Sequence, residues 1–305
     1  MKLPKVVIKY EPNKEVERFY VFLHHSRFPQ NRNLIFNAFP ELPKKLEKQK
    51  KLTETKEKII IKNFIIKFQK EHDDEIKSII KESEKILNVK INKLLTSLFL
   101  LMDYKWPEKE KGFTVIPTIL PFSPFREKVF YFSILAKING RMGHSILFVS
   151  VHEISHIVLY KILEKKYKKP LDKIIDKQLL DFLKEVLAPV LMNQKPILNI
   201  LHQKNYIGNS FLKNIFIIKD KQITQITEFF QEIYEDLKFE KKMNFNQILE
   251  IMIDLVLSIS TEIKEKNKLW NKYGNNIANF KSIFEKYSEP IKIKLTGVFT
   301  PGIDG

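Results

Sequence analysis

The sequence contains no cysteine, and this absence excludes disulfide bonds, cysteine-ligated zinc and cysteine nucleophiles together. Glycine is scarce, with 8 in 305 residues, and Gly140 and Gly143 alone do not make a glycine-rich phosphate-binding loop. The N-terminal segment has only a short apolar run, Val6 to Ile8, which is too short for the core of a signal peptide. A chain without cysteine fits a reducing compartment, and we expect a cytoplasmic protein.

Acidic residues are outnumbered: 53 Lys and Arg face 36 Asp and Glu, which gives a net charge of +17. Such an excess can indicate a partner with many negative charges, such as nucleic acid or an anionic membrane. Here the lysines are spread along the chain and alternate with glutamate and apolar residues, as they do on solvated helix faces. We therefore expect the basic charge to be compositional, and we do not expect nucleic-acid binding.

One pentapeptide carries chemistry: His152-Glu153-Ile154-Ser155-His156, the pattern H-E-x-x-H. On an α-helix, residues four positions apart lie on the same face one turn apart, so both imidazoles can bind one metal ion. The flanking residues Val149 to Val151 and Ile157 to Val158 carry no charge and no proline, which is typical of a buried helix. The alternative is a core helix with two hydrogen-bonded histidines, although such polar groups are costly to bury without a partner.

With these flanks the motif resembles that of the zincin metallopeptidases. The resemblance implies one Zn²⁺ per chain held by His152 and His156, with Glu153 assisting the attack of a zinc-bound water on a peptide bond. Other divalent metals also accept these ligands. The resemblance covers Val149 to Val158 well and is weaker further along the chain.

A catalytic zinc has three protein ligands, so a third is needed. The pattern H-E-x-x-H-x-x-G-x-x-H does not apply, because Leu159 and Ile162 stand at its glycine and third histidine. The gluzincin pattern takes a glutamate from the next helix, and Glu185 is the best candidate because it lies within an apolar run, Leu179 to Met192. Asp181, on the same helix face, is the alternative ligand or a group that orients a ligand histidine.

Two features of the gluzincin pattern stay open in this sequence. That pattern has an Asp four residues after its glutamate, and Pro189 occupies the place here. Gluzincins also often stabilise the oxyanion with a Tyr or His from the C-terminal lobe. His202 and Tyr206 lie in a polar segment that follows the Glu185 helix, and either could serve, although a surface position is the simpler interpretation of each.

The first half of the chain mixes strand and helix patterns. Strands or hairpins are predicted where β-branched and aromatic residues gather, and Pro117 suggests an edge strand or an irregularity. Helices are predicted where apolar residues recur at three- and four-residue spacing. The predicted strand segments are Val6 to Tyr10, Ile59 to Phe68, Phe113 to Leu120 and Val129 to Ile138; the helices are Lys14 to Ser26, Asp73 to Leu101 (with a break near Asn88) and His144 to Tyr167; Arg27 to Pro43 is predicted as loop, and Lys44 to Lys58 as an exposed charged stretch.

The second half reads as helices. One is predicted from Leu171 to Asn193, and Ser210 to Tyr287 is mostly helical by pattern, with a strand and a flexible end in Ile291 to Gly305. The predicted fold class is α+β, mainly helical and zincin-like, with a small sheet and the active-site helix in a lobe of residues 1–167. Residues 168–305 form a helical lobe that carries the third ligand. The zincin resemblance further implies that Val129 to Ile138 lines the cleft and pairs with a peptide, unless it is an ordinary sheet strand.

These observations favour a zinc-dependent metallohydrolase, a peptidase acting on a peptide or protein substrate, with the bond cleaved left open to include other amides. The alternative is a non-catalytic basic helical module that binds nucleic acid or protein and holds a degenerate zinc site. Ser145 to Leu163 approaches the length of a membrane span, but His152, Glu153 and His156 interrupt it, so no membrane insertion is expected. The oligomeric state is not indicated.

Overall fold

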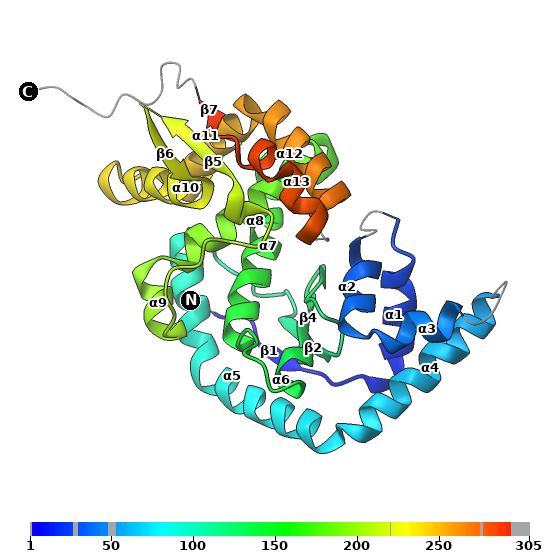
Figure 1. The fold of residues 1–305 in the computed structure, drawn as a ribbon. Coiled ribbons are helices and arrows are strands. Elements are labelled where there is room, and N and C mark those ends of the chain that lie inside the picture. Colours follow the sequence, from blue (N-terminus) through cyan, green and yellow to red (C-terminus); the bar gives the residue numbers. More distant parts are fainter. Residues whose placement is uncertain (1, 27–29, 48–52, 220, 275–276, 294–305) are drawn as a thin grey trace, which may run out of the picture. The chain divides into compact units, whose positions relative to one another are not determined.

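The structure is a computed structural model that describes residues 2–26, 30–47, 53–219, 221–274 and 277–293. Contacts divide the chain into two compact units: residues 1–99 with 105–157, and residues 100–104 with 158–305. This division falls within one helix, after Ile157, whereas the sequence predicts a division after residue 167. The fold class is α+β and mainly helical, as predicted, with two small sheets (Figure 1).

The first unit contains a four-stranded mixed sheet in the order β1-β2-β4-β3. Strands β1, β2 and β4 run parallel, and β3 pairs antiparallel with β4. Their bounds are β1 Val6–Ile8, β2 Phe113–Thr118, β3 Phe125–Arg126 and β4 Val129–Ser133. The predicted strands over β1 and β2 are confirmed. The predicted strand from Val129 to Ile138 is shorter, because the short helix α6 (Leu135–Ile138) takes its second half.

Pro117 lies in β2, an interior strand, but beyond the end of the neighbouring β1, so of the two predicted alternatives the irregularity applies and the edge strand does not. In β2 the backbone groups of Phe113 and Val115 face β1: Phe113 N–H donates to the Lys5 carbonyl, and Val115 accepts from Lys9. By alternation, the missing N–H of Pro117 also faces the β1 side. Strand β1 ends at Ile8, opposite Val115, so no partner is lost there.

A buried polar network ties the first helix to the end of β2. Helix α1 (Glu15–Leu23) presents Glu15, 2% exposed, whose carboxylate accepts hydrogen bonds from the Ile119 N–H (2.9 Å) and the Thr118 hydroxyl. The Arg18 guanidinium donates to the same carboxylate at 2.8 Å and to Glu11 at 2.8 Å. Burying Glu15 is tolerable because its charge is paired and its oxygens are hydrogen-bonded.

Residues 30–47 form helices, so the prediction of a loop from Arg27 to Pro43 is wrong for its described residues. The helices are α2 (Gln30–Ala38) and α3 (Glu41–Glu47). Their buried residues recur at helical spacing: Ile35, Phe39, Leu42 and Leu46. Pro40 lies between the helices, and Pro43 falls in the first turn of α3, where a missing N–H costs nothing.

Residues 59–68 are helical, and the prediction of a strand or hairpin there is also wrong. They belong to α4 (Glu54–Glu71), which begins at Thr53, whose hydroxyl accepts a hydrogen bond from the Lys56 N–H. The buried residues of α4 are Ile61, Phe64 and Ile65, three and four positions apart. The rest of the stretch from Lys44 to Lys58 is divided between α3, α4 and undescribed residues. Helix α5 (Asp73–Leu101) follows and continues through Asn88 without the predicted break.

The second unit contains helices around α8 and a three-stranded sheet, β6-β5-β7. Helix α8 packs against α10, α11 and α12. The elements are α8 Lys177–Met192, α9 Lys195–Leu201, β5 Phe216–Lys219, β6 Gln222–Gln225, α10 Ile226–Glu235, α11 Phe245–Ser258, α12 Ser260–Tyr273, α13 Ile277–Ser288 and β7 Ile291–Lys292.

The β5–β6 hairpin interrupts a segment predicted as mostly helical, and this is the main correction in the second unit. The apolar run Phe216 to Ile218 pairs antiparallel with β6, and β7 adds in parallel. Gln225 ends the hairpin and begins α10, because its side-chain oxygen accepts from the Thr227 and Glu228 N–H groups. The predicted C-terminal strand is confirmed at Ile291–Lys292, and residues 294–305 lie outside the described residues.

Candidate metal centre

The H-E-x-x-H motif lies in the middle of helix α7 (Ile146–Tyr167), so the prediction of a motif helix is confirmed. The Ser145 hydroxyl caps its first turn by accepting the Phe148 N–H at 3.1 Å. Among the described residues α7 is the one helix long and apolar enough to span a membrane, and 83% of that apolar window is buried. A core helix has the same properties, so this finding does not place the helix in a membrane.

His152 and His156 meet one turn apart on α7. Their Nε2 atoms are 3.0 Å apart, and the ring planes cross at 76°. His156 is 1% exposed and His152 is half-buried. Two nitrogens at this distance either share a proton or point their lone pairs toward a common cation, and the second arrangement is what two histidine ligands of one ion require.

Aromatic rings hold both imidazoles in place. The Phe125 ring, from β3, lies 5.5 Å from the His156 ring, and the Phe148 ring lies nearly parallel to the His152 ring at 6.4 Å. The ring of His144 stacks on Phe148 in turn, at 4.1 Å. Each of the two histidines therefore packs beside an aromatic ring, which limits the space open to its side chain.

Glu153 is a buried carboxylate beside the first histidine, with 6% of its surface exposed. It follows His152 directly on α7, where the surrounding residues are almost all apolar. The neighbouring Ser155 hydroxyl donates to the His152 carbonyl at 2.6 Å and is thereby satisfied within the helix. A carboxylate kept at this depth has to be matched by a charged or hydrogen-bonded group.

Glu185 lies in α8, and both of its oxygens are engaged. Asp176 caps the start of α8 by accepting the Gln178 N–H at 2.9 Å. The Lys184 ammonium contacts Oε1 of Glu185, and the Asn209 side-chain amide donates to Oε2 at 3.1 Å. Glu185 is 20% exposed.

The Lys184 ammonium stays charged in this setting. Its burial lowers the pKa of Lys184, but the neighbouring charges of Glu185, Tyr160 and Asp181 raise that pKa by more. The net pKa lies above its ordinary value of 10.5, so Glu185 has a cationic neighbour at neutral pH.

His152, His156 and Glu185 form one group: each offers a ligand atom, and these atoms all lie within 4.8 Å of one another. Zinc bonds of 2.0–2.2 Å in a tetrahedron place ligand atoms about 3.4 Å apart, so the 3.0 Å between the Nε2 atoms suits this ion. Two imidazoles and one carboxylate are also the donor set of an open catalytic zinc site. The residues present therefore fit Zn²⁺, while calcium and magnesium prefer oxygen ligands.

The other predicted candidates lie outside this group. Asp181 is half-buried on α8. His202 is exposed at the end of α9, with φ of +52°, and its N–H donates to the Leu198 carbonyl. Tyr206 is half-buried, and its backbone N–H and carbonyl both bond the Asn193 side chain. A role for His202 or Tyr206 at an oxyanion stays a prediction.

Sequence reasoning missed two residues that contact Glu185. Lys184 carried a visible signal, because a second charge beside Glu185 in the apolar run of α8 needs a partner. Asn209 carried none, because it lies 24 positions along the chain in a polar segment that resembles any surface loop. Sequence spacing identifies ligands that share a helix, but it does not identify a contact made by a distant turn.

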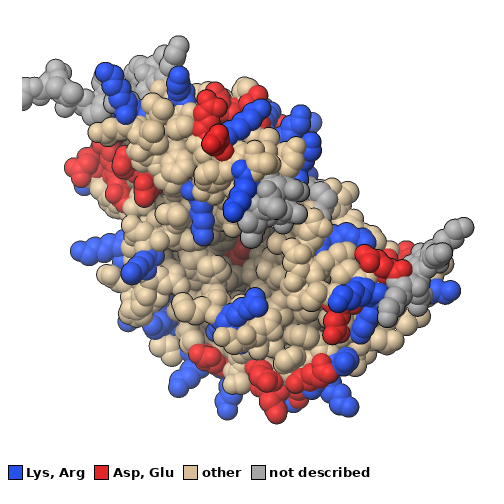
Figure 2. All heavy atoms as spheres, viewed as in Figure 1, with Lys and Arg blue, Asp and Glu red and all other residues tan. Residues whose placement is uncertain are grey.

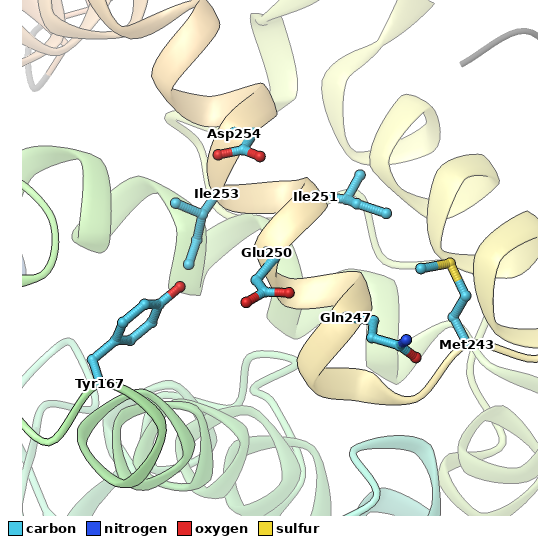
Figure 3. A pocket seen from close by; sticks show the side chains of 7 residues that line it. All are labelled: Tyr167, Met243, Gln247, Glu250, Ile251, Ile253 and Asp254. Carbon is cyan, nitrogen blue, oxygen red and sulfur yellow. The ribbon is translucent and has the colours of Figure 1, made fainter. Parts of the chain in front are cut away.

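The second unit also has an open pocket of about 530 Å³ on helix α11 (Figure 3). Glu250 and Asp254 lie one turn apart there, and Glu250 pairs with Lys166 at 2.6 Å. No predicted site residue lines the pocket, whose residues are Tyr167, Met243, Gln247, Glu250, Ile251, Ile253 and Asp254. We assign it no role.

Comparison with protein-family models, with curated proteins and with solved structures finds no significant match to this chain.

Proposed function

We propose that this chain is a zinc-dependent metallohydrolase, and specifically a peptidase with a zincin-like active-site helix. The observation that carries the proposal is the His152–His156 pair, whose Nε2 atoms lie 3.0 Å apart on one helix, with a ligand oxygen of Glu185 within 4.8 Å. Strand β4 is followed by the short helix α6, residues 139–145 and then α7, so the order of strand and metal-binding helix found in zincins is kept with α6 inserted between them.

His152, His156 and Glu185 would hold the ion. When bound, Zn²⁺ lowers the pKa of a water molecule and polarises a carbonyl group. Glu153 would take the proton from the attacking water and deliver it to the leaving amine, because its carboxylate follows the first ligand directly. Its burial keeps bulk water from competing for that proton.

The edge strand β3 would position a peptide substrate. The zincin resemblance implied this role for Val129 to Ile138, with an ordinary sheet strand as the alternative, and β4 is an interior strand between β2 and β3. Beyond β3, Tyr131 N–H donates to the Pro124 carbonyl and Ser133 N–H to the Ser123 hydroxyl, so the free side of β4 is covered. β3 is an edge, and its Phe125 contacts His156, so an extended peptide added there would pass near the ligands.

The first experiment is elemental analysis of metal content in four proteins purified in parallel: wild type, Glu185→Ala, Glu185→Gln and Asp181→Ala. We expect about one zinc per chain in wild type and in Asp181→Ala, and loss of zinc in both Glu185 variants. Glu185→Gln is included because it keeps the size of the side chain and one acceptor oxygen while it removes the negative charge, and circular dichroism checks that each variant is folded.

Two outcomes would change the assignment. Loss of zinc in Asp181→Ala but not in the Glu185 variants would move the third ligand to Asp181. A wild-type protein that binds no zinc after reconstitution would reject the metallohydrolase and favour the basic binding module. Steep salt-dependent binding of a 20-nucleotide duplex or single strand would then support nucleic acid as its partner.

A further inference from the structure

The Glu185 carboxylate is held by a turn from elsewhere in its own unit. The Asn209 side-chain amide donates to Oε2 of Glu185 at 3.1 Å. Asn209 lies between α9 and β5, 24 positions after Glu185, so this contact is not a by-product of helix geometry. It aims a neutral donor at the oxygen that Lys184 does not contact.

The orientation of the Asn209 amide is fixed by the turn that it begins. Its Oδ1 accepts hydrogen bonds from the N–H groups of Phe211 and Leu212, each at 3.1 Å. Because the oxygen is committed to these two donors, Nδ2 has to point the other way, toward Glu185. The amide therefore cannot flip without breaking the cap of the turn.

The turn is itself anchored. Gly208 precedes it with φ of +92°, a conformation that favours glycine, and a Cβ there would lie 2.7 Å from the Leu212 side chain. On its two sides, Thr227 donates to the Ile207 carbonyl at 3.1 Å, and Gln225 donates to the Leu212 carbonyl at 2.9 Å. Because this turn is constrained at both of its ends, the Asn209 amide that it carries has little freedom to move.

We propose that Asn209 is the positioning residue of the metal centre: its amide fixes the Glu185 carboxylate in the orientation that completes the ligand set. This inference rests on the proposed function. Residues that orient metal ligands commonly contribute 10–100-fold to metal affinity, because a ligand free to rotate loses entropy when the metal binds.

The test compares zinc affinity in wild type, Asn209→Ser and Asn205→Ser by competition with a chromophoric chelator. Serine keeps an oxygen that can cap the turn but is too short to reach Glu185. Asn205 is exposed on the same segment and provides the matched control. We expect the zinc dissociation constant to rise about 10–100-fold in Asn209→Ser and to stay unchanged in Asn205→Ser.

The metal-free thermal midpoint separates positioning from folding. A positioning role predicts weaker zinc binding with a metal-free midpoint close to that of wild type. Unchanged affinity in a folded Asn209→Ser would overturn the inference while leaving the proposed function intact, whereas a wild type that binds no zinc would reject the proposed function itself.

If Asn209→Ser does not fold, side-chain amide NMR of the wild type decides. The Nδ2 protons of Asn209 should shift on zinc addition, while those of Asn205 should not. If the wild type binds zinc but the side-chain amide signals of Asn209 do not shift, the inference is overturned.

Discussion

Glu153 is the side chain on which turnover should depend while metal binding does not. It is 6% exposed and lies beside His152, yet it is not one of the three ligand-bearing residues. Replacing it by Gln preserves size and hydrogen bonding but removes the proton acceptor. We expect Glu153→Gln to retain about one zinc per chain and to lose about 10²–10⁴-fold in turnover.

The measurement uses fluorescein-labelled casein and a library of internally quenched peptides, with zinc content determined on the same samples. Glu164→Gln, a conservative change near the end of the same helix, is the control and should behave as wild type. A Glu153→Gln protein that keeps its zinc and cleaves at the wild-type rate would contradict the assigned role.

For single residues, the sequence predicted only those relative positions that are set within one helix. His152, Glu153 and His156 are related by the helical repeat, so their spacing alone sets their geometry. Glu185 was selected as a candidate by a different principle, since a carboxylate in an apolar run needs a partner. Asn209 depends on the fold of the intervening chain through α9 and the turn after it, and no local pattern encodes that path.

Among the elements, α4 shows why β-branched composition misleads. Residues 59–68 contain five isoleucines and two phenylalanines, which favour a strand, but burial follows the helical set Ile61, Phe64 and Ile65. The prolines of residues 40 and 43 misled in the same way, because their places before α3 and in its first turn are compatible with helix. Tertiary packing overrode composition in both cases.

A proline placed at Asn63 distinguishes the helix from the predicted hairpin. Asn63 is exposed in the middle of α4, where proline removes a backbone hydrogen bond and clashes with the preceding turn. We expect Asn63→Pro to lower the free energy of unfolding by about 3 kcal/mol or more, measured by urea denaturation.

The matched variant Asn63→Ala should be as stable as wild type or slightly more so, because alanine is the better helix former at an exposed position. A hairpin with its turn at Lys62-Asn63 would give the opposite order, with proline tolerated. Equal stability of Asn63→Pro and wild type would therefore contradict the helix.

Over the whole molecule, the net charge of +17 is not gathered on one side in the view of Figure 2. There, Lys and Arg are interspersed with Asp and Glu around the described surface. Many of these charges pair locally, as Lys77 does with Asp73 and Lys241 with Asp236. On this face the distribution is typical of solvated helices rather than of a continuous basic track.

Removal of the metal should lower the free energy of unfolding of the whole chain. An ion bound by the folded chain alone stabilises it by about 4 kcal/mol when its concentration is 1,000 times the dissociation constant. We expect a chelator to lower the thermal midpoint of wild type and added zinc to restore it, as followed by circular dichroism.

The control is the double variant His152→Ala, His156→Ala. Its thermal midpoint should change neither when the chelator is added nor when zinc is added. A double variant that responds as wild type does would show that the stabilising metal binds elsewhere. A wild type that contains zinc but does not respond to its removal would contradict the link between the site and the fold.

Pro117 has a consequence for how the first unit closes its sheet. Strand β1 ends at Ile8, opposite Val115, and at Pro117 the same side of β2 has no N–H to offer. Two residues later, the Ile119 N–H donates to the buried Glu15 carboxylate of α1. A side chain of the first helix thus takes the place of a neighbouring strand, and the end of β2 is covered from within its own unit.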